Sequence, residues 1–127
     1  MARILLIEDD PAARRLVGYA LEQEGHEVLT ASNGIEGLKK AKEEAPELLV
    51  LDVMLPGLDG FEVCHRLRKE EATVDLPILM LSAKAQECDI ATGRKMGADD
   101  YLTKPADPLE IASRVAALLE KPNGSSV

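Results

Sequence analysis

The sequence is poor in aromatic residues, in cysteine and in positive charge. Its rings are Tyr19, Phe61 and Tyr101, with no Trp, so the stacking of nucleic-acid bases on aromatic side chains is excluded as a function. Two cysteines, Cys64 and Cys88, are too few for a disulfide framework or a four-ligand zinc site. We expect both to be reduced thiols that pack as small apolar side chains.

The charge balance is acidic, with 23 Asp and Glu against 15 Lys and Arg and a formal net charge of -8. Affinity for phosphate backbones rests on clustered Lys and Arg, so direct nucleic-acid binding is disfavoured. No basic run indicates an anionic membrane surface. No apolar stretch approaches the roughly 20 residues that span a bilayer, and the N-terminus lacks a signal-peptide pattern. The sequence therefore predicts a cytoplasmic protein that binds neither nucleic acid nor membrane.

The 127 residues, of which 46% are apolar and 30% charged, have the length and composition of one globular domain. The Pro/Gly/Ser-containing residues 121–127 lie beyond the last apolar helix pattern and read as a tail or the start of a linker. We expect one domain over residues 1–120.

Short apolar runs alternate with helical patterns along the chain. The runs predict strands at residues 4–7, 28–30, 48–51, 77–81 and 100–103. Helices are expected after Asp10-Pro11 and after Asn33, through Phe61 to Leu67, over 86–96, and from a capping-box-like Asp107–Glu110 onward. The 86–96 pattern is thin and contains Gly93, which costs about 1 kcal/mol relative to Ala in a helix.

Apolar residues at helical spacing indicate which helix faces are buried. The expected buried positions are Ala13, Leu16, Val17, Ala20 and Leu21 in the first helix, Ile35, Leu38 and Ala41 in the second, and Ile111, Ala112, Val115, Ala116 and Leu119 in the last. Strands alternating with helices predict an α/β fold with a parallel sheet covered on both faces, in the doubly wound, flavodoxin-like strand order 2-1-3-4-5.

Polar residues follow four of the apolar runs. In such a sheet, ligands bind beyond the carboxyl ends of the strands, where the strand order reverses. Glu8, Asp9 and Asp10 follow the first strand, and Asp52 follows the third. Ser82 and Lys104 follow the last two. Each has an ordinary interpretation, such as a loop residue or, for Asp10 before Pro11, a helix cap.

Taken together, these residues predict a chemical site. Converging carboxylates repel one another, and a hard divalent cation with oxygen ligands fits Glu8, Asp9 and Asp52. Mg²⁺ is the expected ion, with Mn²⁺ as an alternative. Asp52 beside such an ion could attack a phosphoryl group and form an aspartyl-phosphate. The ion and Lys104 would neutralise charge on the phosphoryl oxygens, and the Ser82 hydroxyl could donate a hydrogen bond to them.

Four segments resemble motifs of the receiver domain of two-component response regulators: residues 8–10, 51–60, 81–83 and 101–105. The resemblance covers about residues 2–120. It implies a phosphorelay module that accepts a phosphoryl group on Asp52 from a histidine kinase or phosphotransfer protein and catalyses only its own phosphorylation and dephosphorylation. Glu8, Asp9, Asp52 and the Met54 carbonyl would hold the metal, and Ser82, Lys104 and Tyr101 would respond to the phosphoryl group.

The resemblance also implies a cis peptide between Lys104 and Pro105 and a switching surface formed by the fourth helix, the fifth strand and the fifth helix. The charged residues of that surface could pair in a homodimer: Arg94, Lys95, Asp99, Asp100, Glu110 and Arg114.

The sequence departs from the common family pattern at three positions: Glu8 where Asp is frequent, Ser82 where Thr is also common, and Ala106 where many relatives have Phe. Met54 and Lys84 occupy positions that tune phosphoryl hydrolysis in the family. Met54 cannot orient a water molecule by hydrogen bonding, so we expect slow self-dephosphorylation.

Three other functions remain to be weighed. A Mg²⁺-dependent phosphatase with an Asp nucleophile usually has a second carboxylate two residues later, where this chain has Met54. A flavodoxin-type cofactor binder needs a Gly-, Ser- and Thr-rich first loop, which here is acidic. A receiver-like binding module that acts without phosphorylation is the remaining alternative.

Overall fold

Five parallel strands form one sheet with the order β2-β1-β3-β4-β5, as predicted. The structure, a computed structural model, describes residues 2–120. The strands are β1 (Arg3–Ile7), β2 (Glu27–Ala31), β3 (Leu48–Leu51), β4 (Ile78–Ser82) and β5 (Asp100–Thr103). The helices are α1 (Pro11–Gln23), α2 (Gly34–Glu43), α3 (Gly60–Arg68), α4 (Glu87–Met96) and α5 (Pro108–Glu120). The tail that the sequence predicts over residues 121–127 lies outside the described residues.

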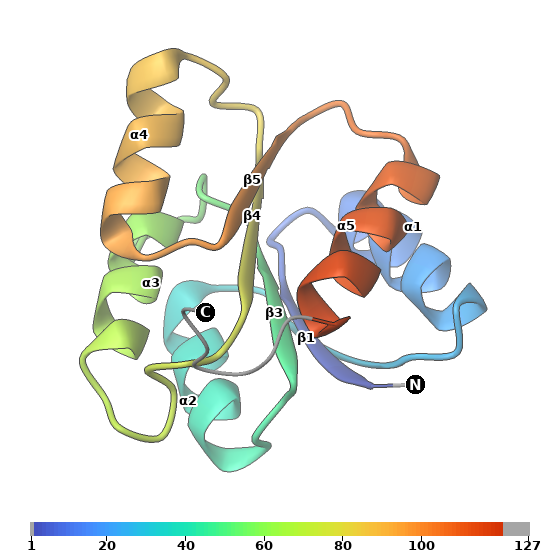
Figure 1. The fold of residues 1–127 in the computed structure, drawn as a ribbon, viewed down its shortest axis with the longest axis horizontal. Coiled ribbons are helices and arrows are strands. Elements are labelled where there is room, and N and C mark those ends of the chain that lie inside the picture. The colour runs from blue at the N-terminus through green and yellow to red at the C-terminus, as the bar shows by residue number, and fades with distance from the viewer. Residues whose placement is uncertain (1, 121–127) are drawn as a thin grey trace.

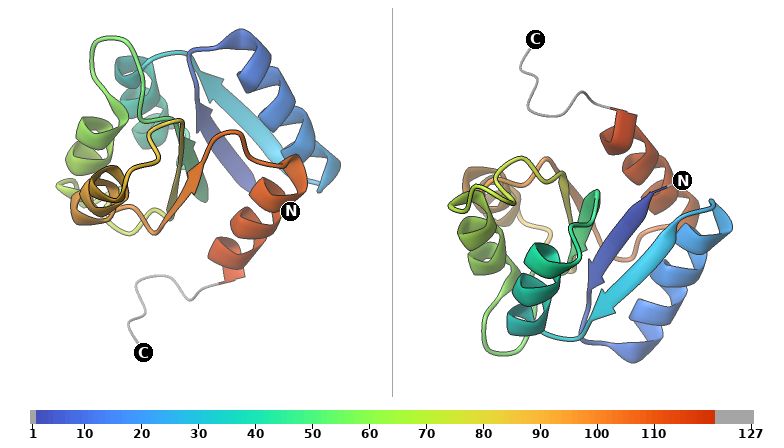
Figure 2. Two further views of the ribbon diagram at one scale, coloured as in Figure 1. Left: turned by 90° about the horizontal axis from the view of Figure 1, so that it is seen from above. Right: turned by 90° about the horizontal axis from the view of Figure 1, so that it is seen from below.

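Helices cover both faces of the sheet. Helices α1 and α5 lie on one face, and α2, α3 and α4 lie on the other (Figures 1 and 2). Successive residues of β1 alternate between two apolar clusters, with Ile4 and Leu6 packed toward the α1/α5 side and Leu5 and Ile7 toward the other. Strand β3, Leu48–Leu51, is buried along its whole length. This explains why the central strands are apolar runs without polar alternation.

Side chains at the helix starts fix where several helices begin. Asp10 Oδ1 accepts a hydrogen bond from Ala12 N at the start of α1, and Asn33 Oδ1 accepts one from Glu36 N at the start of α2. Asp59 Oδ1 accepts one from Glu62 N in α3. Such caps satisfy N–H groups that have no partner within the helix.

The start of α5 differs from the capping box that the sequence predicts. Asp107 Oδ1 accepts a hydrogen bond from Leu109 N at 2.8 Å, one residue earlier than a capping box requires. The Glu110 side chain lies beside Arg114, 3.5 Å from its Nη2 atom. The aspartate therefore caps α5 without the reciprocal glutamate bond.

Three residues predicted to be buried are exposed. Leu16 is 57% exposed and Ile35 64% exposed, and Ala116 also faces solvent. These residues lie at the margin of the apolar face of their helix. The sheet covers only the centre of that face, so helical spacing alone predicts too wide a buried surface. In α5 the buried position that the spacing missed is Leu118.

Candidate functional site

The strand register brings the predicted site residues to one end of the sheet. Ile7 pairs with Leu51, and Ser82 pairs with Thr103, so Glu8, Asp52 and Lys104 each continue directly from a paired strand position. Main-chain bonds extend the ladder through all three of these residues, and Glu8 N donates to Ala31 O at 3.0 Å. Asp52 N donates to Ile7 O at 3.0 Å, and Lys104 N donates to Ser82 O at 2.8 Å. Their backbones are therefore held in place by the sheet itself.

Three carboxylates meet at this end. Glu8, Asp9 and Asp52 each offer an oxygen atom, and these atoms all lie within 4.8 Å of one another. Glu8 and Asp52 are buried, at 2% and 6% exposure, whereas Asp9 is exposed. All three donors are hard anionic oxygens, the ligand type that Mg²⁺ prefers over nitrogen or sulfur. The residues present therefore fit a divalent cation of this kind.

Lys104 supplies positive charge to the same cluster. Its Nζ atom lies 2.6 Å from Glu8 Oε1 and 3.3 Å from Asp52 Oδ2. Burial alone would lower the pKa of this ammonium group, but the hydrogen bond to Glu8 and the charge of Asp52 outweigh burial, so the pKa of Lys104 is raised. The peptide bond between Lys104 and Pro105 is cis.

Further contacts hold Glu8 and separate Asp10 from the cluster. Asp10 N donates to Glu8 Oε2 at 3.2 Å, while the Asp10 side chain caps α1. Arg14 Nη1 donates to the Glu8 carbonyl oxygen at 2.7 Å. The sequence analysis missed Arg14. Its position one helical turn after Asp10, on the first turns of a helix that starts at the site, is the signal that could have identified it.

Ser82 and Tyr101 are linked through the backbone of Lys84. Ser82 is fully buried, and its Oγ atom accepts a hydrogen bond from Lys84 N at 3.2 Å. Tyr101 Oη donates to the Lys84 carbonyl oxygen at 2.7 Å. Burial raises the pKa of Tyr101. The loop after β4 is thus held between the Ser82 hydroxyl at the end of β4 and an aromatic ring on β5.

Met54 lies at the rim of the carboxylate cluster. Its amide N donates to Asp52 Oδ1 at 3.0 Å, and its side chain is 54% exposed. The Asp52 carboxylate is therefore held from both sides, by the Met54 amide at one oxygen and by Lys104 at the other.

Four of the charged residues around α4, β5 and α5 are already paired with one another: Arg94, Asp100, Glu110 and Arg114. Asp100 lies between Arg114, at 2.8 Å, and Arg94, at 3.9 Å. Arg114 is also 3.5 Å from Glu110. A homodimer through these charges would have to exchange internal ion pairs for intermolecular ones.

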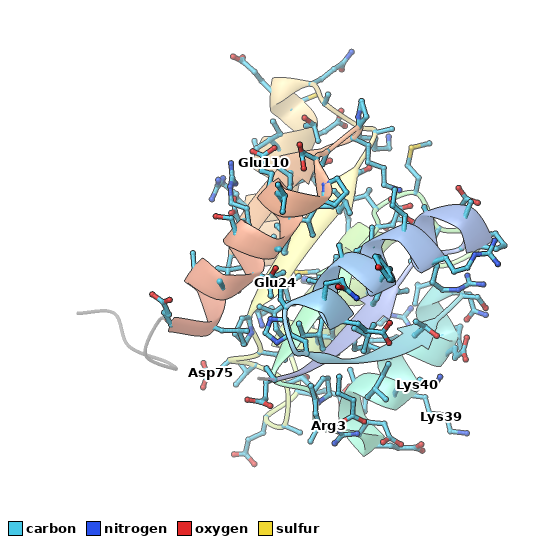
Figure 3. The ribbon with its side chains drawn as sticks, turned by 90° about the vertical axis from the view of Figure 1, so that its right-hand side faces the viewer. Arg3, Glu24, Lys39, Lys40, Asp75 and Glu110 are labelled. Atoms are coloured by element: carbon cyan, nitrogen blue, oxygen red, sulfur yellow. The ribbon has the colours of Figure 1, made fainter. Side chains whose placement is uncertain are left out.

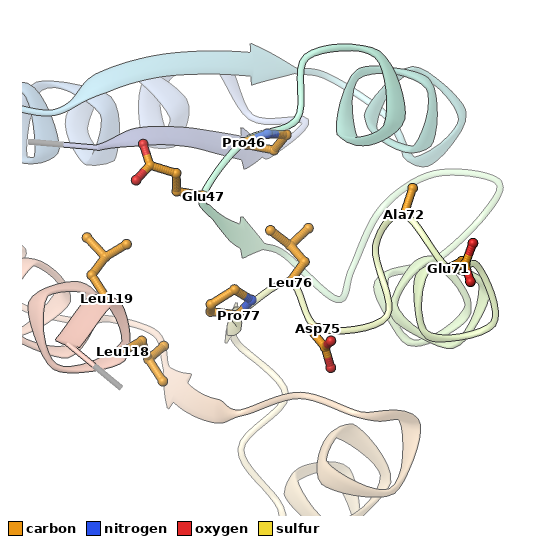
Figure 4. Close-up of a pocket in the computed structure, with 9 residues that line it drawn as sticks. All are labelled: Pro46, Glu47, Glu71, Ala72, Asp75, Leu76, Pro77, Leu118 and Leu119. Carbon is orange, nitrogen blue, oxygen red and sulfur yellow. The ribbon is translucent and has the colours of Figure 1, made fainter. Parts of the chain in front are cut away.

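A hollow of about 460 Å³ lies at the opposite end of the sheet, where β3 and β4 begin. Leu118 and Leu119 of α5 form one side, and Glu47, Glu71 and Asp75 are among its other lining residues (Figure 4). It contains none of the residues predicted to carry chemistry. No helix within residues 2–120 has the length and apolarity of a membrane span.

Comparison with known proteins gives a consistent result. Residues 4–116 match the response regulator receiver domain family. The chain is 50% identical over 119 residues to the alkaline phosphatase synthesis transcriptional regulatory protein PhoP of Bacillus subtilis, covering 94% of this chain and 49% of that protein. It is 51% identical over 121 residues to the DNA-binding dual master transcriptional regulator RpaA of Synechocystis, covering 95% of this chain and 50% of that protein. It therefore spans about half the length of these curated relatives.

The fold agrees with that assignment. The Vibrio cholerae chemotaxis protein CheY4 superimposes with a TM-score of 0.88 at 30% identity, covering 93% of this chain and 98% of that one. The BeF3-activated DrrB receiver domain superimposes with a TM-score of 0.86 at 32% identity, covering 95% and 99%. The acidic cluster at the carboxyl end of the sheet fits the phosphoacceptor site of such domains. The chain belongs to the response regulator receiver domain family of two-component signalling.

Proposed function

We propose that Asp52 accepts a phosphoryl group from the phosphohistidine of a histidine kinase or phosphotransfer protein. The observation that carries the proposal is the meeting of Glu8, Asp9, Asp52 and Lys104 at one end of the sheet. An Asp52 oxygen attacks phosphorus, a P–O bond forms, and the P–N bond to the donor histidine breaks. The electron pair of that bond goes to the imidazole nitrogen. The product is an aspartyl-phosphate on this chain.

Each neighbouring residue has a role in this transfer. Glu8, Asp9 and Asp52, with the Met54 carbonyl, would hold Mg²⁺ or Mn²⁺, which neutralises charge on the phosphoryl oxygens when it is bound. Lys104 can pair with one of these oxygens, because its Nζ atom already lies 3.3 Å from Asp52. Ser82 can donate its hydroxyl proton to another. Its Oγ atom accepts a bond from Lys84 N, which leaves the proton free for that donation.

The switching step follows from the link between Ser82 and Tyr101. A phosphoryl group that draws Ser82 toward it pulls on the loop containing Lys84, whose carbonyl oxygen binds the Tyr101 hydroxyl. Helix α4 packs against this ring through Gly93. Phosphorylation would therefore bias the α4–β5–α5 surface between two states. A homodimer through that surface, and a cytoplasmic location where kinases have ATP, belong to the same proposal.

The deciding experiment uses acetyl phosphate and MgCl₂ with intact-mass measurement. Wild-type protein should gain one phosphoryl group, and Asp52→Asn should gain none. Asp75→Asn, an exposed aspartate at the other end of the sheet, is the matched control and should behave as wild type. Chelation of the metal should abolish the gain in mass. Equal phosphorylation of Asp52→Asn and wild type would refute the assignment.

Slow loss of the phosphoryl group is a second part of the proposal. Met54 contacts Asp52 through its backbone amide, and its exposed thioether is at most a weak hydrogen-bond acceptor, so it would not orient an attacking water. The Met54→Asn protein should lose phosphate faster than wild type when the decay of the phosphorylated mass is followed. An unchanged rate would rule out this role for Met54. Lys84, whose side chain is exposed next to Ser82, is the other position assigned to hydrolysis.

A further inference from the structure

Arg14 connects helix α1 to the loop that carries two of the clustered carboxylates. Helix α1 begins at Pro11, three residues after Glu8, and packs beside α5 on one face of the sheet (Figure 3). The Arg14 Nη1 atom donates to the Glu8 carbonyl oxygen at 2.7 Å and to the Asp9 carbonyl oxygen at 3.4 Å. One guanidinium group therefore contacts the main chain of both acidic residues that follow β1.

The Glu8 carbonyl oxygen has no partner in the sheet. The ladder reaches Glu8 only through its amide, which donates to Ala31 O at 3.0 Å. The main-chain bonds of α1 start later, where Arg14 N donates to Asp10 O. Within residues 2–120, the Glu8 carbonyl oxygen accepts a hydrogen bond from Arg14 alone. Because Glu8 is only 2% exposed, loss of that donor would leave a buried acceptor unsatisfied.

Asp9 is held less firmly than Glu8 in every other respect. The Glu8 side chain is bound at both oxygens, by Lys104 Nζ at 2.6 Å and by Asp10 N at 3.2 Å. Asp9 is exposed, and the bond from Arg14 is the only hydrogen bond that it makes in the part of the chain that the structure describes. Fixing a loop residue in one conformation costs conformational entropy. Arg14 restricts the Asp9 main chain before any cation binds.

An arginine is suited to this position. Its guanidinium group is planar and always charged, and it presents five N–H donors, so one side chain can bond two successive carbonyl oxygens. The Arg14 side chain is partly covered, whereas the neighbouring Arg15 is exposed and makes no side-chain hydrogen bond or ion pair within residues 2–120. The two arginines thus carry the same charge on one helix, but only Arg14 contacts the acidic loop.

We propose that Arg14 is a positioning residue for the divalent cation, because it fixes the main chain of Glu8 and Asp9 so that their carboxylates can bind metal together with Asp52. This inference rests on the metal site proposed above, and it has a definite sign. Arg14 and the cation are both positive, so repulsion alone would make the loss of Arg14 tighten metal binding. Positioning makes the same loss weaken it.

The test measures Mg²⁺ binding to the unphosphorylated protein by following amide chemical shifts in NMR spectra at constant ionic strength. Arg14→Met removes the donors and the charge but keeps a long side chain that favours a helix. Arg14→Gln, which is equally neutral, takes its place if that variant does not fold in thermal unfolding. Arg14→Lys keeps the charge and one compact donor group. Arg15→Met removes the same charge one residue away and is the matched control.

The dissociation constant for Mg²⁺ should rise about tenfold in Arg14→Met or Arg14→Gln, as expected when a group that holds metal ligands in place is removed. It should rise less in Arg14→Lys and stay within about twofold of wild type in Arg15→Met. With acetyl phosphate, the MgCl₂ concentration that gives half the maximal rate should rise by the same factor. The rate at saturating MgCl₂ should stay within about threefold of wild type, a separation that a merely structural role would not produce.

Three results would overturn this role of Arg14. Mg²⁺ binding to the neutral Arg14 variants that is as tight as in wild type, or tighter, would leave only a charge effect or none. An equal weakening in Arg15→Met would assign the effect to the net charge of α1. A lower rate at saturating MgCl₂ with an unchanged dissociation constant would place Arg14 in the transfer step instead. A wild-type protein that binds no Mg²⁺ would overturn the metal site itself, and this inference with it.

Discussion

Helices α3 and α4 lie side by side on the same face of the sheet, but they are attached to it in different ways (Figure 1). Helix α3 buries Val63, Cys64 and Leu67 completely. Helix α4 has a single buried residue, Gly93, and Ile90 and Met96 are partly covered. Helix α3 is therefore part of the hydrophobic core, whereas α4 lies over the core and contributes little buried surface to it.

The far end of α4 is fixed by a side chain from α3. Arg68 donates hydrogen bonds to the Gly97 carbonyl oxygen at 2.8 and 3.0 Å and to Asp99 Oδ2 at 3.0 Å. The same guanidinium donates to the carbonyl oxygens of Thr73, Val74 and Leu76. The start of α4 is held by fewer bonds: the Tyr101 hydroxyl donates to the Lys84 carbonyl oxygen, and Gln86 N donates to Asp89 Oδ2. The contrast teaches that α4 can move at the end closest to the site while α3 stays in place.

The alkylation rates of the two free cysteines should show the largest difference between these helices, because Cys64 is on α3 and Cys88 is on α4. Cys64 is buried, as expected, but Cys88 is exposed, so the expectation that both thiols pack as small apolar side chains is wrong for Cys88. Burial raises the pKa of the Cys64 thiol to about 11. Alkylation by iodoacetamide at pH 8 should modify Cys88 roughly a thousandfold faster, because Cys64 requires an opening of several kcal/mol. Peptide mass mapping over time gives both rates.

Similar labelling rates at both cysteines would mean that α3 opens as readily as α4 and would remove the contrast.

The raised pKa of the Cys64 thiol also makes stability depend on pH. The Cys64 contribution to stability is complete below the thiol pKa of an unfolded chain, about 8.5, and is lost as pH rises toward 11. Cys64→Ala should flatten this part of the pH dependence in chemical denaturation.

Truncation of one apolar residue on each helix comes next in size. Leu67→Ala should lower the free energy of unfolding by about 2–5 kcal/mol, since the side chain is fully buried. Ile90→Ala, whose side chain is only partly covered, should cost about 1 kcal/mol or less. Urea denaturation measures both. Losses of the same size would show that α4 belongs to the core after all.

Enlarging Gly93 tests how α4 contacts the sheet. A Cβ atom there would lie 2.8 Å from Tyr101 Cδ2 and 2.9 Å from Met80 Sδ. The higher helix propensity of Ala offsets part of this overpacking, so Gly93→Ala should destabilise by about 1 kcal/mol. Gly18→Ala in α1 is the control, because its nearest contact would be 3.9 Å away. That variant should stabilise slightly, and a Gly93→Ala variant that also stabilises would place α4 farther from β5.

The smallest effect concerns the exposed ion pair on α3. Arg66 Nε lies 3.0 Å from Glu62 Oε2 at i,i+4 spacing. Glu62→Ala should change the free energy of unfolding by only about 0.3–0.5 kcal/mol, as measured in the same urea titrations at low and high salt. A loss above about 1 kcal/mol would indicate that charge, and not burial, fixes α3.

The fold was largely predictable, because each signal is local. Apolar runs such as residues 48–51, caps such as Asp10 and Asn33, and the alternation of elements all come from neighbouring residues. Even the thin 86–96 pattern is confirmed as α4, Glu87–Met96. Gly93 had weakened that prediction through its low helix propensity. The structure shows why glycine stands there, since a side chain would collide with Tyr101.

What the sequence could not supply are contacts between distant residues. The 2.6 Å pair of Lys104 with Glu8 joins residues 96 positions apart, and Arg68 reaches Gly97 across 29. Periodicity predicts that Leu16 and Ile35 are buried, but both are exposed. It identifies the apolar stripe of a helix but not how much of that stripe the sheet covers. The convergence of Glu8, Asp9 and Asp52 was foreseeable from strand order. Which of them Lys104 contacts most closely was not.

The direction of α5 determines how a signal could leave the domain. This helix begins after Lys104, beside the carboxylates, and its last turn places Leu118 and Leu119 at the opposite end of the sheet. Its 13 residues span about 20 Å along the axis. A segment joined to the chain after Glu120 is therefore attached at the end of the sheet opposite Asp52. A conformational change caused by a phosphoryl group on Asp52 would therefore have to reach such a segment along the side of the domain, because the point of attachment is far from Asp52.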